Sequence, residues 1–146
     1  MIYDTAMERV VLDTNVLVSA MLSDRGPAFQ LLSRVGTGQF EISLSVALVF
    51  EYESVLRRRT SLTDADIAAL VDYLCSIGHR QKIFYLWRPT LRDPGDDLVL
   101  ELAVASCSTR IVTYNGRDFA GAERFGIAVT DPVQFLRQLG DSSWVR

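Results

Sequence analysis

Residues 10–18 read Val-Val-Leu-Asp-Thr-Asn-Val-Leu-Val, an apolar and largely β-branched run that is interrupted at Asp13. Such a run predicts a buried parallel strand that leads directly into a helix. In open α/β sheets, ligands bind outside the carboxyl ends of the strands, which is where this arrangement places Asp13. A buried carboxylate is costly unless a metal ion, a cation or hydrogen bonds compensate its charge. We therefore expect Asp13 to have a functional role.

The rest of the chain alternates between strand-like and helix-like segments, with Gly and Pro at many of the breaks. We expect strands at residues 9–12, 40–44, 82–87, 110–113 and 127–130. We expect helices from residue 15 or 16, after Gly26-Pro27, after a capping Ser45, over 63–77, from Asp96 or Asp97, and from Pro132, with a loop over 89–95. Short strands separated by helices predict an α/β fold whose parallel sheet is covered on both faces. This pattern alone does not give the strand order.

Size and composition indicate one folded domain. The chain has 146 residues, of which 49% are hydrophobic and 23% are charged, as in ordinary globular proteins. We therefore expect a single domain over residues 1–146, with residues 1–6 as a loose N-terminal tail. No apolar stretch has the length of a membrane span and no signal-peptide pattern opens the chain, so we expect no membrane partner. Cys75 and Cys107 lie in apolar helical patterns and are expected to be buried free thiols, which suits the cytoplasm.

The charge balance lacks the basic signature of a simple nucleic-acid-binding protein, because the formal net charge is -3. Among the 15 basic residues, however, Lys82 is the only lysine. Arginine is the side chain best shaped for bidentate phosphate contacts. The cluster Arg57-Arg58-Arg59 is compatible with a solvated helix end and with an RNA-contacting patch.

Further acidic residues occur at locations comparable to that of Asp13. Asp97 follows a loop rich in Pro and Gly, Asp118 comes shortly after the strand expected at 110–113, and Glu51 lies among apolar neighbours in an expected helix. Each also has a structural alternative, since acidic residues cap and stabilise helix N-termini and a helical glutamate can face solvent.

Taken together, these acids favour a metal site. Carboxylates gathered in one crevice repel one another unless a cation is present. The single histidine, His79, and the cysteine spacing argue against nitrogen and sulfur ligands, so oxygen-ligated Mg²⁺ or Mn²⁺ is the natural choice. Such a site can activate water and stabilise negative charge on a phosphate.

The motifs resemble, in their order and spacing, those of PIN-domain ribonucleases, including the VapC-like toxins of bacterial toxin–antitoxin pairs. They read Val-Leu-Asp-Thr-Asn-Val-Leu-Val-Ser-Ala (11–20), Glu-Tyr-Glu-Ser-Val-Leu-Arg (51–57), Asp-Pro-Gly-Asp-Asp (93–97) and Ile-Val-Thr-Tyr-Asn-Gly-Arg-Asp-Phe (111–119). The resemblance extends from about Glu8 to Leu139. It implies a three-layer α/β/α PIN-like fold with a five-stranded parallel sheet in the order 3-2-1-4-5.

The resemblance also implies roles for individual residues. The catalytic and metal-ligating acids fall on Asp13, Glu51, Asp97 and Asp118. Glu53 competes with Glu51, because periodicity does not separate them, although Arg57 offers Glu53 a surface partner four residues on.

The resemblance implies that Asn15, Thr113 and Asn115 support the acids through hydrogen bonds. It also implies that Asp96 could partly take the place of its neighbour Asp97. Many PIN domains have Thr-x-Asp after the fourth strand, whereas this chain has Thr113-Tyr114-Asn115. The fourth acidic role therefore goes to Asp118, as in a subgroup with the pattern Thr-x-Asn-x-x-Asp-Phe.

The implied activity is Mg²⁺- or Mn²⁺-dependent endoribonucleolytic hydrolysis of RNA phosphodiester bonds. The implied partners are a cognate antitoxin and a second copy of the chain in a homodimer. One alternative is a non-catalytic PIN-like module that binds RNA or protein, for which Asn115 in place of an acid is the argument. A second alternative is a haloacid-dehalogenase-like phosphatase, but that chemistry needs an aspartate where Asn15 stands and a suitably placed lysine other than Lys82.

Overall fold

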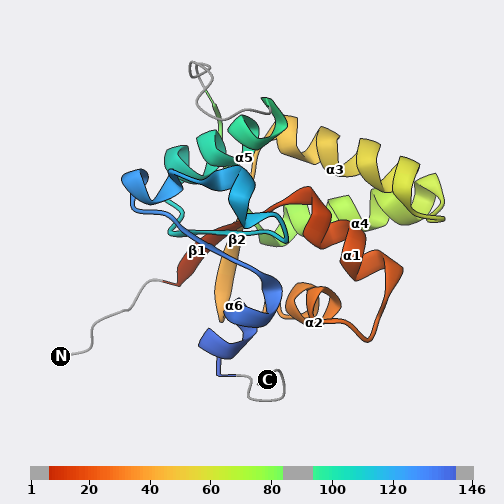
Figure 1. The fold of residues 1–146 in the computed structure, drawn as a ribbon. Coiled ribbons are helices and arrows are strands. Elements are labelled where there is room, and N and C mark those ends of the chain that lie inside the picture. The colour runs from red at the N-terminus through yellow and green to blue at the C-terminus, as the bar shows by residue number, and fades with distance from the viewer. Residues whose placement is uncertain (1–6, 84–93, 141–146) are drawn as a thin grey trace.

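The computed structural model describes residues 7–83 and 94–140, and within them it shows a five-stranded parallel sheet in the order β3-β2-β1-β4-β5 (Figure 1). The strands are β1 (Glu8–Leu12), β2 (Phe40–Leu44), β3 (His79–Arg80), β4 (Arg110–Val112) and β5 (Ala128–Thr130). The α-helices are α1 (Thr14–Leu22), α2 (Pro27–Ser33), α3 (Val46–Arg59), α4 (Asp64–Ile77), α5 (Pro94–Ala105) and α6 (Pro132–Gln138). Two 3₁₀ helices, η1 (Gly116–Phe119) and η2 (Ala122–Phe125), connect β4 to β5. The predicted fold class and strand order are both confirmed.

Helices cover both faces of the sheet, so that strands β1 and β4 are buried on both sides. On one face, α5 packs against β1, β2 and β4. On the other face, Phe135 of α6 meets Phe40 of β2 edge to face, with ring centroids 5.1 Å apart. Helix α6 also lies beside α2, which packs on α1 (Figure 1). The apolar run of β1 is therefore fully buried, as its composition predicts, with Val10, Val11 and Leu12 at most 1% exposed.

The third strand differs from the prediction. The structure places β3 at His79–Arg80, where it pairs with Ser43 and Leu44 of β2. Residues 82 and 83 are not in a strand, and residues 84–87 of the predicted strand lie outside the described part of the chain. An edge strand of two residues is set by pairing with its neighbour, which the apolar composition of the following segment does not reveal.

Two helix starts also differ. Helix α5 begins at Pro94, so Pro94 and Gly95 belong to the helix rather than to a loop, and Asp96 and Asp97 lie in its first turn. Proline is favoured at this position because the first amide of a helix has no intrahelical acceptor. Helix α1 begins at Thr14, earlier than predicted, because Asp13 is its N-cap.

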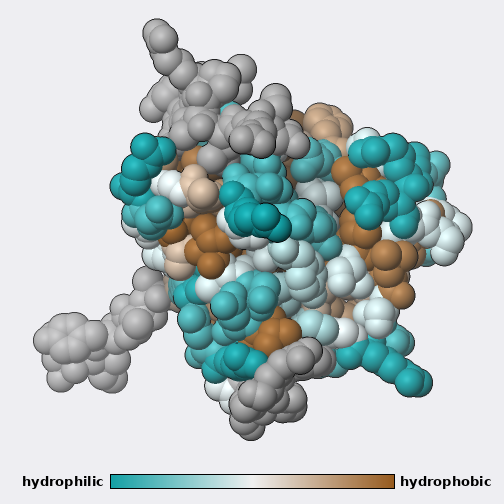
Figure 2. Space-filling model, viewed as in Figure 1, coloured by the Kyte–Doolittle hydropathy of each residue, from teal (hydrophilic) through white to brown (hydrophobic). Residues whose placement is uncertain are grey.

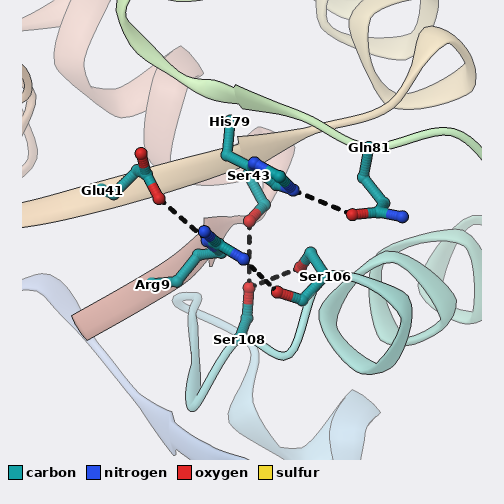
Figure 3. Close-up of polar contacts among 7 residues, drawn as sticks. All are labelled: Arg9, Glu41, Ser43, His79, Gln81, Ser106 and Ser108. Atoms are coloured by element: carbon teal, nitrogen blue, oxygen red, sulfur yellow. Dashed lines mark hydrogen bonds and ion pairs between the residues drawn. The ribbon is translucent and has the colours of Figure 1, made fainter. Parts of the chain in front are cut away.

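A polar network ties the C-terminal end of α5 to the sheet (Figure 3). The Arg9 guanidinium donates to Glu41 at 2.9 Å and to the Ser106 carbonyl oxygen at 2.7 Å. The Ser108 hydroxyl lies 3.1 Å from that of Ser43 and 2.7 Å from that of Ser106, and all three serines are buried. Each buried hydroxyl thus has a hydrogen-bond partner, which offsets the cost of burying it.

The two cysteines are free thiols, but they are not buried as predicted. Cys107 is exposed and Cys75 is half-buried. Cys107 lies just after α5 with a φ of 57°, in the left-handed region, and its amide donates to the Val104 carbonyl oxygen. It therefore belongs to the turn that ends the helix, outside the apolar periodic segment.

Apolar side chains reach the face of the molecule drawn in Figure 2 in separate patches among hydrophilic ones. Among the exposed residues are Leu22 at the end of α1 and Val46 and Phe50 on α3. The arginine cluster is exposed in the last turn of α3, where Arg57 pairs with Asp64 at 3.1 Å rather than with Glu53. None of the described helices has the length and apolar character needed to span a membrane.

Candidate carboxylate site

The site is built at the carboxyl ends of β1 and β4, the two central strands of the sheet. Asp13 directly follows β1, and its amide donates to the Val112 carbonyl oxygen at 2.9 Å, which extends the pairing of the two strands. Thr113 directly follows β4, so the two side chains leave the sheet side by side. From β1 the chain continues toward β2 and from β4 toward β5, on opposite sides. Such a switch point is where open α/β sheets form ligand crevices.

Asp13 is 8% exposed and accepts three hydrogen bonds. The Thr14 amide donates to Oδ1 at 2.9 Å. The Thr113 hydroxyl donates to Oδ2 at 2.8 Å, and the Asn15 amide nitrogen Nδ2 lies 3.3 Å from the same oxygen. Asp13 therefore has a structural role as the cap of α1, in addition to whatever chemistry it performs.

The electrostatic environment of Asp13 disfavours its charged form. Burial raises the pKa of Asp13 above its ordinary value of 3.8, and the hydrogen bonds from Thr113 and Thr14 only partly oppose this rise. The nearby charges of Glu51 and Asp118 raise it further. The fold thus brings Asp13, Glu51 and Asp118 into one electrostatic neighbourhood, where an added cation would relieve both burial and repulsion.

Helix α3 brings Glu51 to this neighbourhood. The Thr14 hydroxyl donates to Glu51 Oε2 at 2.7 Å. The next residue, Tyr52, is buried and its hydroxyl donates to the Leu12 carbonyl oxygen at the end of β1. Burial, followed by the charges of Asp13 and Glu51, raises the pKa of the Tyr52 phenol well above 10.0.

The competing glutamate lies elsewhere on the helix. Glu53 is close enough to the Cys75 thiol of α4 to contribute to the raised pKa of that thiol, whose main cause is burial. The hydrogen bond to Thr14 therefore places Glu51, rather than Glu53, on the Asp13 side of α3.

Asn15 and Thr113 brace one another across the two strand ends. Asn15 Nδ2 lies 3.3 Å from the Thr113 hydroxyl oxygen, and Asn15 Oδ1 accepts from the Tyr114 amide at 3.2 Å. The Thr113 hydroxyl oxygen also accepts from the Asn115 amide at 3.0 Å. The Asn115 side chain is exposed in the turn before η1. These bonds fix the direction of the Thr113 hydroxyl toward Asp13.

The remaining predicted acids lie on α5 and η1. Asp118 is exposed within η1, which the buried Phe119 anchors to the core. It does not cap the following segment. Asp96 and Asp97 are half-buried in the first turn of α5, a helix that packs against β1, β4 and η1.

The donor chemistry fits a hard divalent cation, although the acids are not drawn together into a ready-made cage. In the ranges 7–83 and 94–140, no three His, Cys, Asp or Glu side chains form a group that could hold a metal ion. Mg²⁺ usually keeps several waters and is bound through one or two carboxylates together with substrate phosphates. Asp13 and Glu51 are two carboxylates of this kind that the structure joins through Thr14.

A separate cavity of about 980 Å³ lies beside the edge strand. It is lined by the start of α3, the segment that follows β3, Cys75 of α4, and Leu98 and Glu101 of α5. None of the four predicted acids lines it.

Three residues that help to build the site were not predicted from the sequence. Thr14 and Tyr52 stand inside the quoted motifs, but the partners of their hydroxyls lie 37 and 40 residues away along the chain. Tyr114 is 42% exposed, and its backbone amide donates to Asn15 Oδ1 at 3.2 Å. Only their place inside the motifs could have drawn attention to them.

The fold and the site together define a three-layer α/β protein with a carboxylate site at its switch point. The family model of the PIN domain matches residues 9–117. The chain therefore belongs to the PIN domain family, whose members are nucleases that generally use divalent metal ions. This membership favours the PIN interpretation over the haloacid-dehalogenase-like alternative.

A solved structure with a similar fold is that of VapBC2 from Rickettsia felis bound to a DNA fragment from its promoter. The two chains are 17% identical, the match covers 84% of this chain and 98% of the other, and the TM-score is 0.55. At this identity the likeness shows the shared fold. No curated protein matches the chain.

Proposed function

We propose that this protein is a metal-dependent ribonuclease that hydrolyses RNA phosphodiester bonds with Mg²⁺ or Mn²⁺. The observation that carries the proposal is the buried Asp13 at the switch point, whose charged form is disfavoured by burial and by the charges of Glu51 and Asp118. A fold keeps such a carboxylate at a cost in stability, and perturbed acids of this kind cluster at functional sites.

The side chains divide into two groups in this proposal. Asp13 and Asp97 hold the cation directly, while Glu51 and Asp118 act through water or complete a second site. Asn15, Thr113 and Asn115 steady these ligands, and Asp96 can replace its neighbour in part. A bound divalent cation would supply water activation and charge neutralisation at the phosphate.

The residues of this chain then perform the positioning. Three donors hold the two oxygens of Asp13, one of them on Oδ1 and two on Oδ2, which leaves a lone pair of Oδ1 for a cation. Asp118 is exposed on η1, on the solvent side of the site, where it can orient an attacking water. Arginines supply the positive charge that an RNA backbone needs near an acidic site, with the exposed Arg117 directly preceding Asp118.

The experiment is cleavage of a mixed pool of structured RNAs with Mg²⁺ or Mn²⁺. We expect metal-dependent cleavage that EDTA, Asp13→Asn and Asp97→Asn each abolish. Glu53→Gln is the matched control for Glu51→Gln, because both substitutions are on α3 but only Glu51 is on the Asp13 side of that helix. We expect Glu51→Gln to reduce cleavage and Glu53→Gln to leave it unchanged. Metal binding without cleavage across the pool would instead support a non-catalytic RNA- or protein-binding module.

We further propose that the protein acts in the cytoplasm as the toxin of a toxin–antitoxin pair, as a homodimer held inactive by a cognate antitoxin. The fold it shares with VapBC2 from Rickettsia felis supports this. Induced expression in a bacterial host should arrest growth, and Asp13→Asn should remove the arrest at equal protein level. Growth that continues with the active protein would argue for an RNA-processing role.

A further inference from the structure

Thr14 donates hydrogen bonds to two of the acids of the site, Asp13 and Glu51. Its backbone amide donates to Asp13 Oδ1 at 2.9 Å, and its hydroxyl donates to Glu51 Oε2 at 2.7 Å. The first bond is local, whereas the second joins residues that lie 37 positions apart. One residue thereby links the first carboxylate to the second.

The two ends of this link are held rigidly. Thr14 is 6% exposed and occupies the first position of α1, where the cap at Asp13 fixes its backbone. The backbone of Glu51 is held by its neighbour Tyr52, which is buried and bonded to the carbonyl oxygen of Leu12. The Glu51 side chain itself is only half-buried, so its rotamer is not fixed by packing.

Electrostatics alone would turn the Glu51 side chain away. Asp13 and Glu51 are two acidic side chains that accept hydrogen bonds from the same residue, Thr14, so their charges lie close together. A flexible, half-exposed glutamate lowers such repulsion by rotating toward solvent. The Thr14 hydroxyl, a short charge-assisted donor, opposes that rotation.

We propose that Thr14 is a positioning residue whose hydroxyl holds the Glu51 carboxylate toward Asp13, so that both acids face one cation before it binds. The inference rests on the proposed metal-dependent function but concerns a residue that does not itself ligate. It predicts a role for the hydroxyl that goes beyond joining α1 to α3.

The test compares Thr14→Val, which removes the hydroxyl and keeps the branched shape, with Thr14→Ser, which keeps the hydroxyl. Thr130→Val is the control for loss of a threonine hydroxyl, since Thr130 accepts from Arg110 outside the site. Mn²⁺ affinity is measured by electron paramagnetic resonance on each folded variant. We expect about 10-fold weaker binding for Thr14→Val, the usual loss when a ligand loses its supporting hydrogen bond. Thr14→Ser and Thr130→Val should stay within about twofold of the original protein.

A double variant shows whether Thr14 acts through Glu51. If it does, Thr14→Val combined with Glu51→Gln binds Mn²⁺ no more weakly than Glu51→Gln alone. Additive losses, or equal losses in Thr14→Val and Thr14→Ser, would overturn the proposal and assign Thr14 a general structural role.

A second readout separates this proposal from the nuclease proposal. In metal-free protein, the melting-temperature changes of Thr14→Val and Glu51→Ala should be non-additive, because each removes the same hydrogen bond. Non-additive changes in a protein that neither binds Mn²⁺ nor cleaves RNA would support the link and refute the function. Additive changes in an active nuclease would refute the link and leave the function intact.

Discussion

Tyr52 provides the sharpest test of how the candidate site is held in place. Its ring is 1% exposed, and its hydroxyl donates to the Leu12 carbonyl oxygen, one residue before Asp13. This bond joins α3 to the end of β1 and so sets where Glu51, the preceding residue, stands relative to Asp13. Tyr52→Phe removes the hydroxyl oxygen and keeps the buried ring.

The expected cost follows from burial. A typical hydrogen bond contributes about 0.5–1.5 kcal/mol net, and the cost is larger when the remaining partner is buried. We therefore expect Tyr52→Phe to lower the free energy of unfolding by about 1–2 kcal/mol. With an unfolding entropy of about 2.1 cal/mol/K per residue, a 146-residue chain has about 0.3 kcal/mol/K in total. The melting temperature should then fall by about 3–6 °C.

The assay is thermal unfolding followed by circular dichroism, with Tyr73→Phe as the matched control. Tyr73 is 52% exposed, and its hydroxyl lies 3.4 Å from the Val35 carbonyl oxygen. Removing that long, only partly buried contact should change the melting temperature by less than about 2 °C. Equal shifts in the two variants would refute the argument that burial makes the Tyr52 bond strong.

Two further predictions concern stability. Asp13→Asn should raise the free energy of unfolding at pH 7 by up to about 1 kcal/mol, because removing the buried charge outweighs the loss of the acceptor for Thr113 and Asn15, and asparagine still caps α1 through Oδ1. The pKa of Asp13 in the folded state lies above its ordinary value of 3.8. The free energy of unfolding therefore falls as the pH rises from 3.8 through the folded-state pKa, and below pH 3.8 the charge of Asp13 costs no stability. The gain in melting temperature should therefore vanish near pH 3, and a gain that persists there would refute the electrostatic explanation. Cys107→Gly should stabilise by about 0.5–1 kcal/mol, because glycine adopts the left-handed φ of 57° without strain. Cys107→Ala, which keeps Cβ, should show no such gain in the same melting experiment.

Local chemistry explains which parts of the fold could be predicted. Ser45 caps α3 by accepting from the Leu48 amide, and Thr63 forms a capping box with Asp66 at the start of α4. These caps depend on residues three positions apart, so they are visible in the sequence. The buried strand β1 was predictable for a similar reason, because burial on both faces leaves a continuous apolar run.

What the sequence did not show depends on contacts between distant segments. Edge strand β3 forms at His79–Arg80 because β2 offers Ser43 and Leu44 for pairing, not because its own composition favours a strand. Periodicity could not separate Glu51 from Glu53, since the distinction is made by Thr14, on another helix. The exposure of Cys107 follows from a helix that ends two residues earlier than the apolar pattern.

Asp13 shows why stability and function compete at this site. The same carboxylate ends β1, caps α1 and carries a charge whose pKa is raised by burial. Asparagine could end the strand and cap the helix without the electrostatic cost, although it would lose the acceptor that Thr113 and Asn15 use, so these two tasks alone give no reason for an acid there. The hydrogen bonds from Thr14 and Thr113 reduce that cost without removing it, because they stabilise the charged form in place. Such a compromise is expected where a charged group must be present before its ligand arrives, and a bound cation would convert the destabilising charge into binding energy.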